Sequence, residues 1–467
     1  MRDCPSIFND VLSTITRGRP ESRVVEGSRI GELIHQAAGP MIKSVIIKVD
    51  PDGALASLPD DNLSKMALAC GIMGVPITDH RALKWEKIAE GLGIEFTFKA
   101  EDFRSVHPNH YKIEIAVEPG HGRMIGIAES HVFDAISEKG GEVELIAIDG
   151  LPVSVKGDRD ENIVFGKNEY RFKNTYPIGT CSEDDNDASI PFTTVSEMRN
   201  YNKEHGLELW QLALVYESAR SGMSHEILLA MTGEIYEVMR ESLKTGLALM
   251  HAEGKLPKDV PNGKSVIPGV AINEAITYIN AISETIDAEE VYVAAPDQKT
   301  AACLPGTLFA VADALIPVDE ALDFEDRGEY IKAEVVKALL AGGLIAVLSQ
   351  GKEHDGARAI TAAAVCQLAG GSAEDCVKAA GYADANVLAG MSAISAVNAT
   401  FADFGTAAPN GQRVCADEDF ESDINWRERR RAFDEECRQK LAREYPENES
   451  RSTSDEEDYS GLDSILF

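Results

Sequence analysis

The chain has 467 residues, of which 44% are hydrophobic and 26% are charged, and its formal net charge is −33 at pH 7. Its length and apolar content predict one or two sizeable buried cores. The negative charge disfavours nucleic acid and anionic membranes as partners, because proteins bind both through Lys and Arg. The first residues carry no apolar signal-peptide core, and the longest apolar run, 338–348, is shorter than a membrane span, so we expect a soluble cytoplasmic protein.

The eight cysteines are scattered along the chain without a CxxC pair. This pattern argues against a structural zinc site and against a disulfide framework. We therefore expect free thiols in a reducing compartment.

Residues 40–155 have the pattern of a compact α/β unit. Runs of β-branched or alternating residues bounded by turns predict strands, and apolar residues at helical spacing predict helices. The predicted strands are 43–49, 94–99, 111–117, 123–128 and 142–148, and the predicted helices are 65–74 and 79–91. This order indicates a small sheet with helices on one face.

The second half of the chain has a different texture. The stretch 158–191 is polar and without a sustained period, which predicts a linker. Beyond it, helical spacing dominates in the segments 195–204, 208–221, 225–253, 271–285, 308–315, 333–349, 357–368, 373–380 and 385–401. Several of these segments are rich in Ala and Gly, so we expect tight helix-on-helix packing. After Pro409 the chain becomes charged, and its end is expected to be partly disordered.

Several short motifs follow one another between residues 4 and 400. They are Cys4-Pro5-Ser6-Ile7-Phe8-Asn9-Asp10-Val11, Arg29-Ile30-Gly31, Asp50-Pro51-Asp52-Gly53, His107-Pro108-Asn109, Leu304-Pro305-Gly306-Thr307-Leu308 and Leu368-Ala369-Gly370-Gly371. In this order and approximate spacing the chain resembles the iron-sulfur L-serine dehydratases, or L-serine ammonia-lyases. Several weak motifs in one order are more specific than any one of them alone.

The resemblance implies a domain map. Residues 1–157 would form an α/β domain similar to the allosteric substrate-binding domain of some phosphoglycerate dehydrogenases. Residues 158–192 would be the linker, 193–410 an all-α domain of the catalytic type, and 411–467 an acidic, partly disordered tail.

The chain departs from the family where the family holds its 4Fe-4S cluster. The first cluster cysteine should fall near 350–355, the Cys-Asp-Pro-Val motif is Ser392-Ala393-Ile394-Ser395 here, and no Pro-Cys is found around 400–405. The open iron of such a cluster is the Lewis acid for the leaving hydroxyl. The sequence therefore supports no cofactor and no metal site. Recruitment of Cys303, Cys366 and Cys376 is the alternative, but their spacing matches no ligand pattern, and small buried cysteines usually serve packing.

The motif His107-Pro108-Asn109 retains the polar residues that the family brings to its substrate. An uncharged imidazole can act as a base near neutral pH, so His107 is a candidate catalytic residue and Asn109 a candidate substrate ligand. Ser22 is the remaining member of a serine run of the family and a third candidate. The alternative is a loop retained for its turn geometry.

The segment Asp297-Gln298-Lys299-Thr300 replaces a glycine-rich loop of the family. Lys299 could anchor a substrate carboxylate or act as a base, with Asp297, Gln298 and Thr300 lining the same pocket. An exposed charged turn is the competing interpretation.

Two further segments carry reactive side chains. The run Lys352-Glu353-His354-Asp355 contains competent ligands for a divalent metal, although a solvated loop is the favoured interpretation. The acidic run 452–458 could accept phosphate from an acid-directed kinase, and disorder without a role is the default.

The predicted function is a cluster-independent lyase related to L-serine dehydratase, acting on a small amino acid or carboxylate by elimination or a related proton transfer. The alternatives are a homologue that binds a ligand or partner without catalysis, and a conventional L-serine ammonia-lyase. A dry pocket with His107 and Lys299 converging would favour the enzyme. The expected partner is a small molecule, with no nucleic acid and no membrane, and a homodimer is compatible with these observations.

Overall fold

The computed structural model describes residues 5–12, 15–17, 22–79, 81–118, 130–138, 141–165, 168–178, 190–252, 269–287, 292–293, 295, 297–316, 324–349, 356–383, 393–397 and 400. The chain divides into two units after Thr400, and every described residue lies in the first of them. The predicted tail, 411–467, and the segments 352–355 and 452–458 therefore lie outside the described residues.

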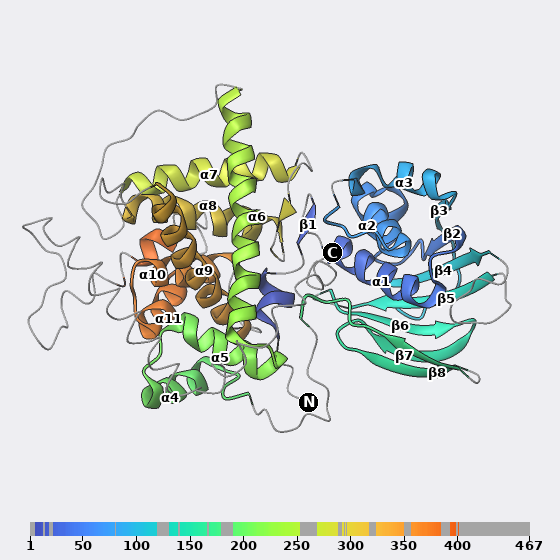
Figure 1. The fold of residues 1–467 in the computed structure, drawn as a ribbon, viewed down its shortest axis with the longest axis horizontal. Coiled ribbons are helices and arrows are strands. Elements are labelled where there is room, and N and C mark those ends of the chain that lie inside the picture. The colour runs from blue at the N-terminus through green and yellow to red at the C-terminus, as the bar shows by residue number, and fades with distance from the viewer. Residues whose placement is uncertain are drawn as a thin grey trace, which may run out of the picture. The chain divides into compact units, whose positions relative to one another are not determined.

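The first part of the fold is a six-stranded mixed sheet with the strand order β3-β2-β4-β5-β6-β7 (Figure 1). Its strands are β2 (Ile42–Val49), β3 (Glu95–Ala100), β4 (His110–Val117), β5 (Ser130–Ser137), β6 (Val143–Ile148) and β7 (Leu151–Lys156). β2 and β3 run parallel, and the other neighbours are antiparallel. A parallel pair needs a crossover connection, and α2 (Asn62–Met73) and α3 (Trp85–Leu92) lie in the connection from β2 to β3.

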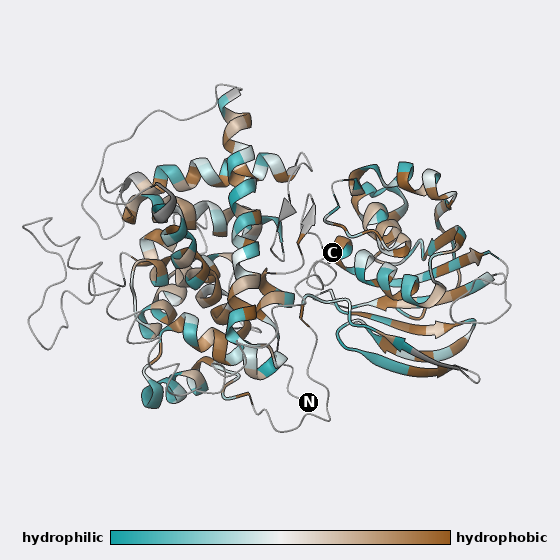
Figure 2. Cartoon of the chain, in the orientation of Figure 1, coloured by the Kyte–Doolittle hydropathy of each residue, from teal (hydrophilic) through white to brown (hydrophobic). Residues whose placement is uncertain are grey.

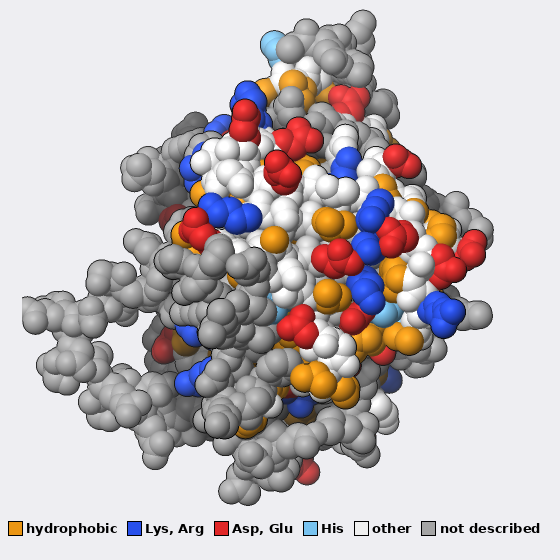
Figure 3. All heavy atoms as spheres, turned by 90° about the vertical axis from the view of Figure 1, so that its right-hand side faces the viewer, with side chains coloured by type: hydrophobic (Ala, Val, Ile, Leu, Met, Phe, Trp, Pro, Cys, Tyr) orange, Lys and Arg blue, Asp and Glu red, His pale blue; other side chains and the backbone are white. Residues whose placement is uncertain are grey.

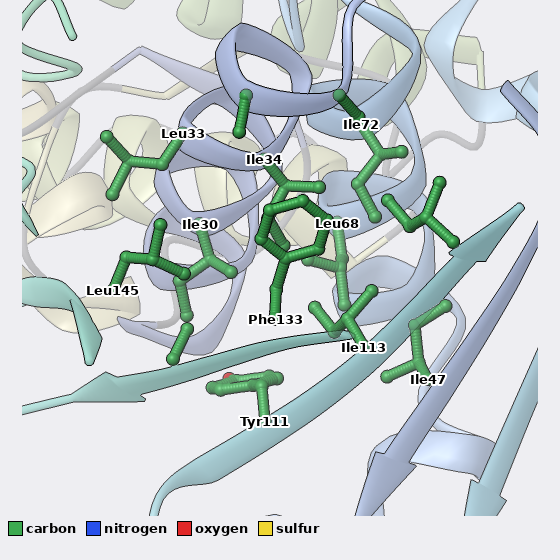
Figure 4. Packing of buried hydrophobic residues seen from close by; sticks show 14 of the residues in the cluster. Ile30, Leu33, Ile34, Ile47, Leu68, Ile72, Tyr111, Ile113, Phe133 and Leu145 are labelled. Carbon is green, nitrogen blue, oxygen red and sulfur yellow. The ribbon is translucent and has the colours of Figure 1, made fainter. Parts of the chain in front are cut away.

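The alternation of side chains along the strands decides which face of the sheet is buried. In β4 the buried positions alternate with half-buried ones, and Figure 2 shows hydrophobic and hydrophilic residues following one another along the strands. The buried face packs against α1 (Ser22–Ala38) and α2 in one hydrophobic core. Figure 4 shows its centre, where Ile30 and Ile34 of α1 and Leu68 of α2 lie over Tyr111, Ile113 and Phe133 of the sheet.

α1 and α2 pack against each other through glycines. A Cβ atom on Gly31 would lie 2.6 Å from the carbonyl oxygen of Leu68, and a Cβ on Gly71 would lie 2.5 Å from that of Ser28. Both distances are too short for a real side chain, so the two backbones are in direct contact here. This contact brings the apolar sides of both helices down onto the sheet together.

The second part is largely helical. Its helices are α4 (Val195–His205), α5 (Leu209–Ser221), α6 (His225–Ala252), α7 (Gly269–Asp287), α8 (Gln298–Leu315), α9 (Phe324–Leu348), α10 (Gly356–Leu368) and α11 (Ala373–Tyr382). Glycines again sit where helices meet: Cβ atoms on Gly306 and Gly342 would lie 2.8 Å from backbone atoms of Ile279 and Ile360. The expected tight packing of small-residue helices is thus confirmed at the α7–α8 and α9–α10 contacts.

A short helical turn near the start of the chain, η1 (Ile7–Leu12), packs among these helices rather than on the sheet. The Ser6 hydroxyl and the Ile7 amide donate hydrogen bonds to the carboxylate of Glu217 in α5, each at 2.9 Å. The Tyr216 hydroxyl donates to the Pro5 carbonyl at 2.7 Å. A Cβ on Gly343 of α9 would lie 2.5 Å from the Ile7 side chain.

The fold class expected from the sequence, an α/β region followed by a helical one, is confirmed. The predicted strand 123–128 lies outside the described residues, whereas β5, β7 and α1 were not predicted. The predicted linker, 158–192, is not without regular structure, because it contains the hairpin of β8 (Glu161–Phe165) and β9 (Asn168–Phe172). Phe172 of this hairpin is buried in the core of the α/β region. None of the described helices combines the length and the apolar character that crossing a membrane requires.

Candidate functional site

The loop before β4 carries two of the predicted site residues, His107 and Asn109. The backbone N–H of Asn109 donates to Nδ1 of His107 at 3.1 Å, and the Ser105 hydroxyl donates to the His107 carbonyl at 2.5 Å. Because a backbone N–H can only donate, Nδ1 must accept, and the neutral imidazole carries its proton on Nε2. In this geometry His107 offers a hydrogen-bond donor to a ligand rather than a basic nitrogen.

Asn109 fastens this loop to the neighbouring strand. Its side-chain amide donates to the carbonyl of Ser137 at 3.3 Å, and the Ser137 amide donates to the Asn109 carbonyl at 3.1 Å. Ser137 is the last residue of β5 and is fully buried. These two hydrogen bonds therefore fix the position of the loop relative to the end of β5.

The turn after β2 touches the same loop. The amide of Ala54 donates to the Pro108 carbonyl at 3.0 Å, and a Cβ on Gly53 would lie 2.8 Å from that carbonyl oxygen. Gly53 is thus needed for the close approach of two backbones. The Asp50-Pro51-Asp52-Gly53 turn and the His107-Pro108-Asn109 loop, two motifs distant in sequence, form one surface.

The first turn of α1 joins this surface from a third direction. The guanidinium of Arg23 donates to the Ala54 carbonyl and to the Ser57 hydroxyl, each at 2.8 Å. One helical turn later, the buried carboxylate of Glu26 accepts a hydrogen bond from the Ser137 hydroxyl at 2.8 Å. Ser22 is the first residue of the same helix, and its side chain lies outside the described part.

Tyr111 lies beneath these groups and is completely buried. Its hydroxyl makes no hydrogen bond of good geometry to any part of the chain that the structure describes. Burial raises the pKa of Tyr111 above its ordinary value, and the Glu26 carboxylate raises it further, while Ser137 and Arg23 act in the opposite sense. The phenol therefore stays protonated and is a buried donor.

These side chains form one group, which we name the Arg23 cluster; its members are Arg23, Glu26, Ser57, His107, Asn109, Tyr111 and Ser137. Of these, only His107 and Asn109 were predicted from the sequence. Arg23, Glu26 and Ser137 were missed because the start of α1 and the strand β5 were not recognised, whereas Tyr111 lies in the predicted strand 111–117 but was not singled out. The Arg next to the predicted Ser22 was the available signal.

The remaining predicted residues lie at the start of α8. Asp297 is the N-cap of this helix, and its carboxylate accepts hydrogen bonds from the Thr300 amide at 2.9 Å and hydroxyl at 2.7 Å. Gln298 is half-buried and Lys299 is exposed in the first helical turn. Asp297 and Thr300 thus stabilise the helix end, and the predicted facing of Lys299 towards His107 stays a prediction.

A short ladder links the chain segments ahead of these two places. β1 (Thr16–Arg17) pairs antiparallel with β10 (Tyr292–Val293). β1 precedes α1, and β10 precedes α8. The ladder therefore connects the segment that leads into α1 with the segment that leads into α8.

The cysteines of the helical region are buried packing residues. Cys303 lies in α8, while Cys366 and Cys376 lie in α10 and α11 beside the backbone of Gly371. Burial raises the pKa of Cys376, and the neighbouring Cys366 adds to this effect. Within the described ranges, no three Cys, His, Asp or Glu side chains come together as metal ligands. These residues do not fit a cluster held by three cysteines.

One hollow of about 370 Å³ lies away from these groups, between α4 and α11. Arg199 and Glu374 line it and form a bidentate ion pair, with nitrogen-to-oxygen distances of 2.7 and 2.8 Å. The pair connects the two helices, and the charge of Arg199 is already balanced there.

Comparison with known proteins gives one distant similarity. Over 165 residues the chain is 26% identical to a probable L-serine dehydratase, beta chain, of Bacillus subtilis (strain 168). The match covers 35% of this chain and 70% of the Bacillus protein. No family model matches the chain. The chain is thus distantly related, over part of its length, to an L-serine dehydratase beta chain.

Proposed function

We propose that the chain binds a small amino or hydroxy acid at the Arg23 cluster and removes water from it by α,β-elimination, without an iron-sulfur cluster. The similarity to an L-serine dehydratase beta chain supports the substrate class. The observation that carries the proposal is the meeting of the start of α1, the turn at Gly53 and the His107 loop, which hydrogen bonds hold together.

Two donors of different character suit a substrate carboxylate. Among the described residues, the guanidinium of Arg23 uses two of its five N–H groups, and its planar fork matches a carboxylate. The Nε2–H of His107 is a neutral donor, and the completely buried Tyr111 supports the site from beneath. Glu26 supplies the negative charge that a substrate ammonium group requires.

The proposed reaction breaks two bonds. A base takes the proton from the α carbon and passes it to the β hydroxyl, which leaves as water. From an amino acid, the resulting enamine becomes an imine that water converts to a 2-oxo acid and ammonia; from a hydroxy acid, the resulting enol becomes the 2-oxo acid directly. The developing negative charge on the substrate carboxylate needs a cation nearby. We assign this role to Lys299, which stands at the start of α8.

The family's cluster enters no step of this proposal, because the cysteines of the described residues do not meet as three ligands. A second candidate function is ligand binding without turnover. It is favoured because two of the candidate residues already have structural roles: Arg23 holds the turn after β2, and Asp297 caps α8.

The test uses the purified full chain, prepared with and without oxygen. Binding of L-serine, L-threonine and glycerate is measured by calorimetry, and 2-oxo acid release is followed with a coupled lactate dehydrogenase assay. Arg23→Met should weaken binding at least tenfold, because it removes the fork. Arg81→Met is the matched control, since Arg81 is exposed and, among the described residues, forms its ion pair with Asp79. Lys299→Met should abolish turnover and leave folding intact.

The outcomes separate the two functions. Binding that depends on Arg23, with no 2-oxo acid from any substrate, supports the binding protein and contradicts the lyase. Full turnover in Lys299→Met removes Lys299 from the mechanism. Reconstitution with about four irons per chain would overturn the cluster-independent reaction and restore ordinary serine dehydration.

A further inference from the structure

The outer edge of β3 is an open sheet edge. β3 is the last strand in the order β3-β2-β4-β5-β6-β7, and no other strand of the described residues pairs with it. An edge strand presents unpaired N–H and C=O groups, which can pair with another chain. Figure 3 views the α/β region from outside, and acidic, basic and apolar side chains are interleaved on this face.

The register of β3 against β2 determines which backbone groups face outward. The strands are parallel, with Val45 opposite Phe96 and Val49 opposite Ala100, and the Glu101 amide donates to the Val49 carbonyl at 2.9 Å. Alternate residues of a strand direct their backbone groups to the same side. Glu95, Thr97, Lys99 and Glu101 therefore face β2. Phe96, Phe98 and Ala100 direct their N–H and C=O groups to the open edge.

The side chains along this strand are arranged symmetrically about Thr97. The sequence Glu95-Phe96-Thr97-Phe98-Lys99 places an acidic and a basic residue at equal distances from the centre, with a phenylalanine on either side. Glu95 is exposed and makes no ion pair within the described residues. Lys99 is half-buried and contacts Glu101, which Lys48 also contacts.

We propose that β3 pairs antiparallel with β3 of a second copy of the chain, about a two-fold axis through Thr97. Phe96 then lies opposite the partner subunit's Phe98, and their outward backbone groups exchange hydrogen bonds. Glu95 lies opposite the partner subunit's Lys99, and this occurs twice by symmetry. These charged pairs fall at the positions without hydrogen bonds, where side chains come closest across an antiparallel ladder.

Two other registers that keep the backbone pairing are disfavoured by charge. A shift of the pairing by two residues towards the end of the strand places Glu95 opposite the partner's Glu101. A further shift of two residues places Lys99 opposite itself. Like charges directly opposite each other are unfavourable. The register centred on Thr97 pairs opposite charges at both ends.

Aromatic residues supply apolar area at the same edge. Phe96 and Phe98 stack with centroids 6.3 Å apart, and Trp85 of α3 contacts both edge-on, at 5.5 and 6.0 Å. All three rings are half-buried in the single chain. Leu92, at the end of α3, is 54% exposed. A second copy at β3 would cover part of this aromatic group as well as pair the backbone.

The experiment measures the oligomeric state of the full chain by sedimentation velocity over a range of concentrations. The wild-type chain should dimerise reversibly, whereas Glu95→Lys and Lys99→Glu should each weaken dimerisation at least tenfold, because each places like charges opposite each other. An equimolar mixture of these two variants should dimerise again, since both cross-chain pairs then have opposite charges. The double variant Glu95→Lys/Lys99→Glu should also dimerise as the wild type does.

Glu204→Lys serves as the matched control, because it makes the same charge change on an exposed residue of α4. It should leave dimerisation unchanged. A wild-type chain that stays monomeric at all concentrations overturns the proposal. So does a dimer that both single variants form as well as the wild type, because its interface must then lie elsewhere.

Discussion

The contact between α1 and α2 gives the sharpest test of the packing. Replacing Gly31 with Ala puts a Cβ atom 2.6 Å from the Leu68 carbonyl oxygen, 2.7 Å from the Ile72 nitrogen and 2.8 Å from the Gly71 Cα. All three neighbours are backbone atoms, so no side chain can rotate away. The helices must separate by several tenths of an ångström, and both helices carry residues of the core beneath them.

The magnitude follows from two opposing effects. Ala in a helix interior is better than Gly by about 0.5–1 kcal/mol. Overpacking in a well-packed interior costs about 1–3 kcal/mol, and the upper part of this range applies because backbone meets backbone. We expect a net loss of about 1–2 kcal/mol in the free energy of unfolding.

Gly91→Ala is the matched control. Gly91 lies in α3, and a Cβ there would have nothing within 4 Å. The same substitution should therefore stabilise the chain by about 0.5–1 kcal/mol. Urea unfolding gives the sign of both changes, and hydrogen exchange of α1 and α2 amides localises the effect of Gly31→Ala. If Gly31→Ala is as stable as the wild type, the helices are not in backbone contact and the reasoning fails.

Two other predictions concern single carboxylates. Burial raises the pKa of Glu32 from 4.5 to about 7, although Arg29 opposes this, so the folded chain keeps a proton that the unfolded chain releases. The free energy of unfolding should therefore fall by at most about 3 kcal/mol as the pH rises from 4.5 to 7. Glu32→Gln should remove this pH dependence, which urea unfolding at pH 5 and pH 8 measures. The same difference between the two pH values in Glu32→Gln and in the wild type would contradict the prediction. Asp297→Ala should lower stability by about 1 kcal/mol through loss of the α8 cap, whereas Asp297→Ser should retain most of it; equal stability of the two variants would count against the capping role.

The sequence predicted the elements whose pattern depends on one buried face. β2 and β4 alternate clearly between buried and half-buried positions, so their period was sufficient. α1 was missed because Gly27 and Gly31 look like helix breakers in the sequence. These glycines are required by the close contact with α2, which exists only in the folded chain.

The site was predictable in part for the same reason. His107 and Asn109 lie in a short motif, which can be recognised locally. The hydrogen bond between Glu26 and Ser137 joins residues 111 positions apart, and no spacing rule foretells it. The capping role of Asp297 was foreseeable, because an Asp just ahead of a segment with helical apolar spacing is a local signal for the start of a helix.

The position of η1 against α9 determines when, during synthesis, this segment can be buried. Ile7 rests against Gly343, which a ribosome adds 336 residues later. At about 5–20 residues per second, translation leaves an interval of roughly 15–70 s between the two. Throughout it, the buried residues of η1 lack the contacts that α9 supplies, although α5, which Ile7 also contacts, is made earlier. The burial of η1 is therefore complete only after α9 has been made, and we expect this apolar segment to bind chaperones during synthesis.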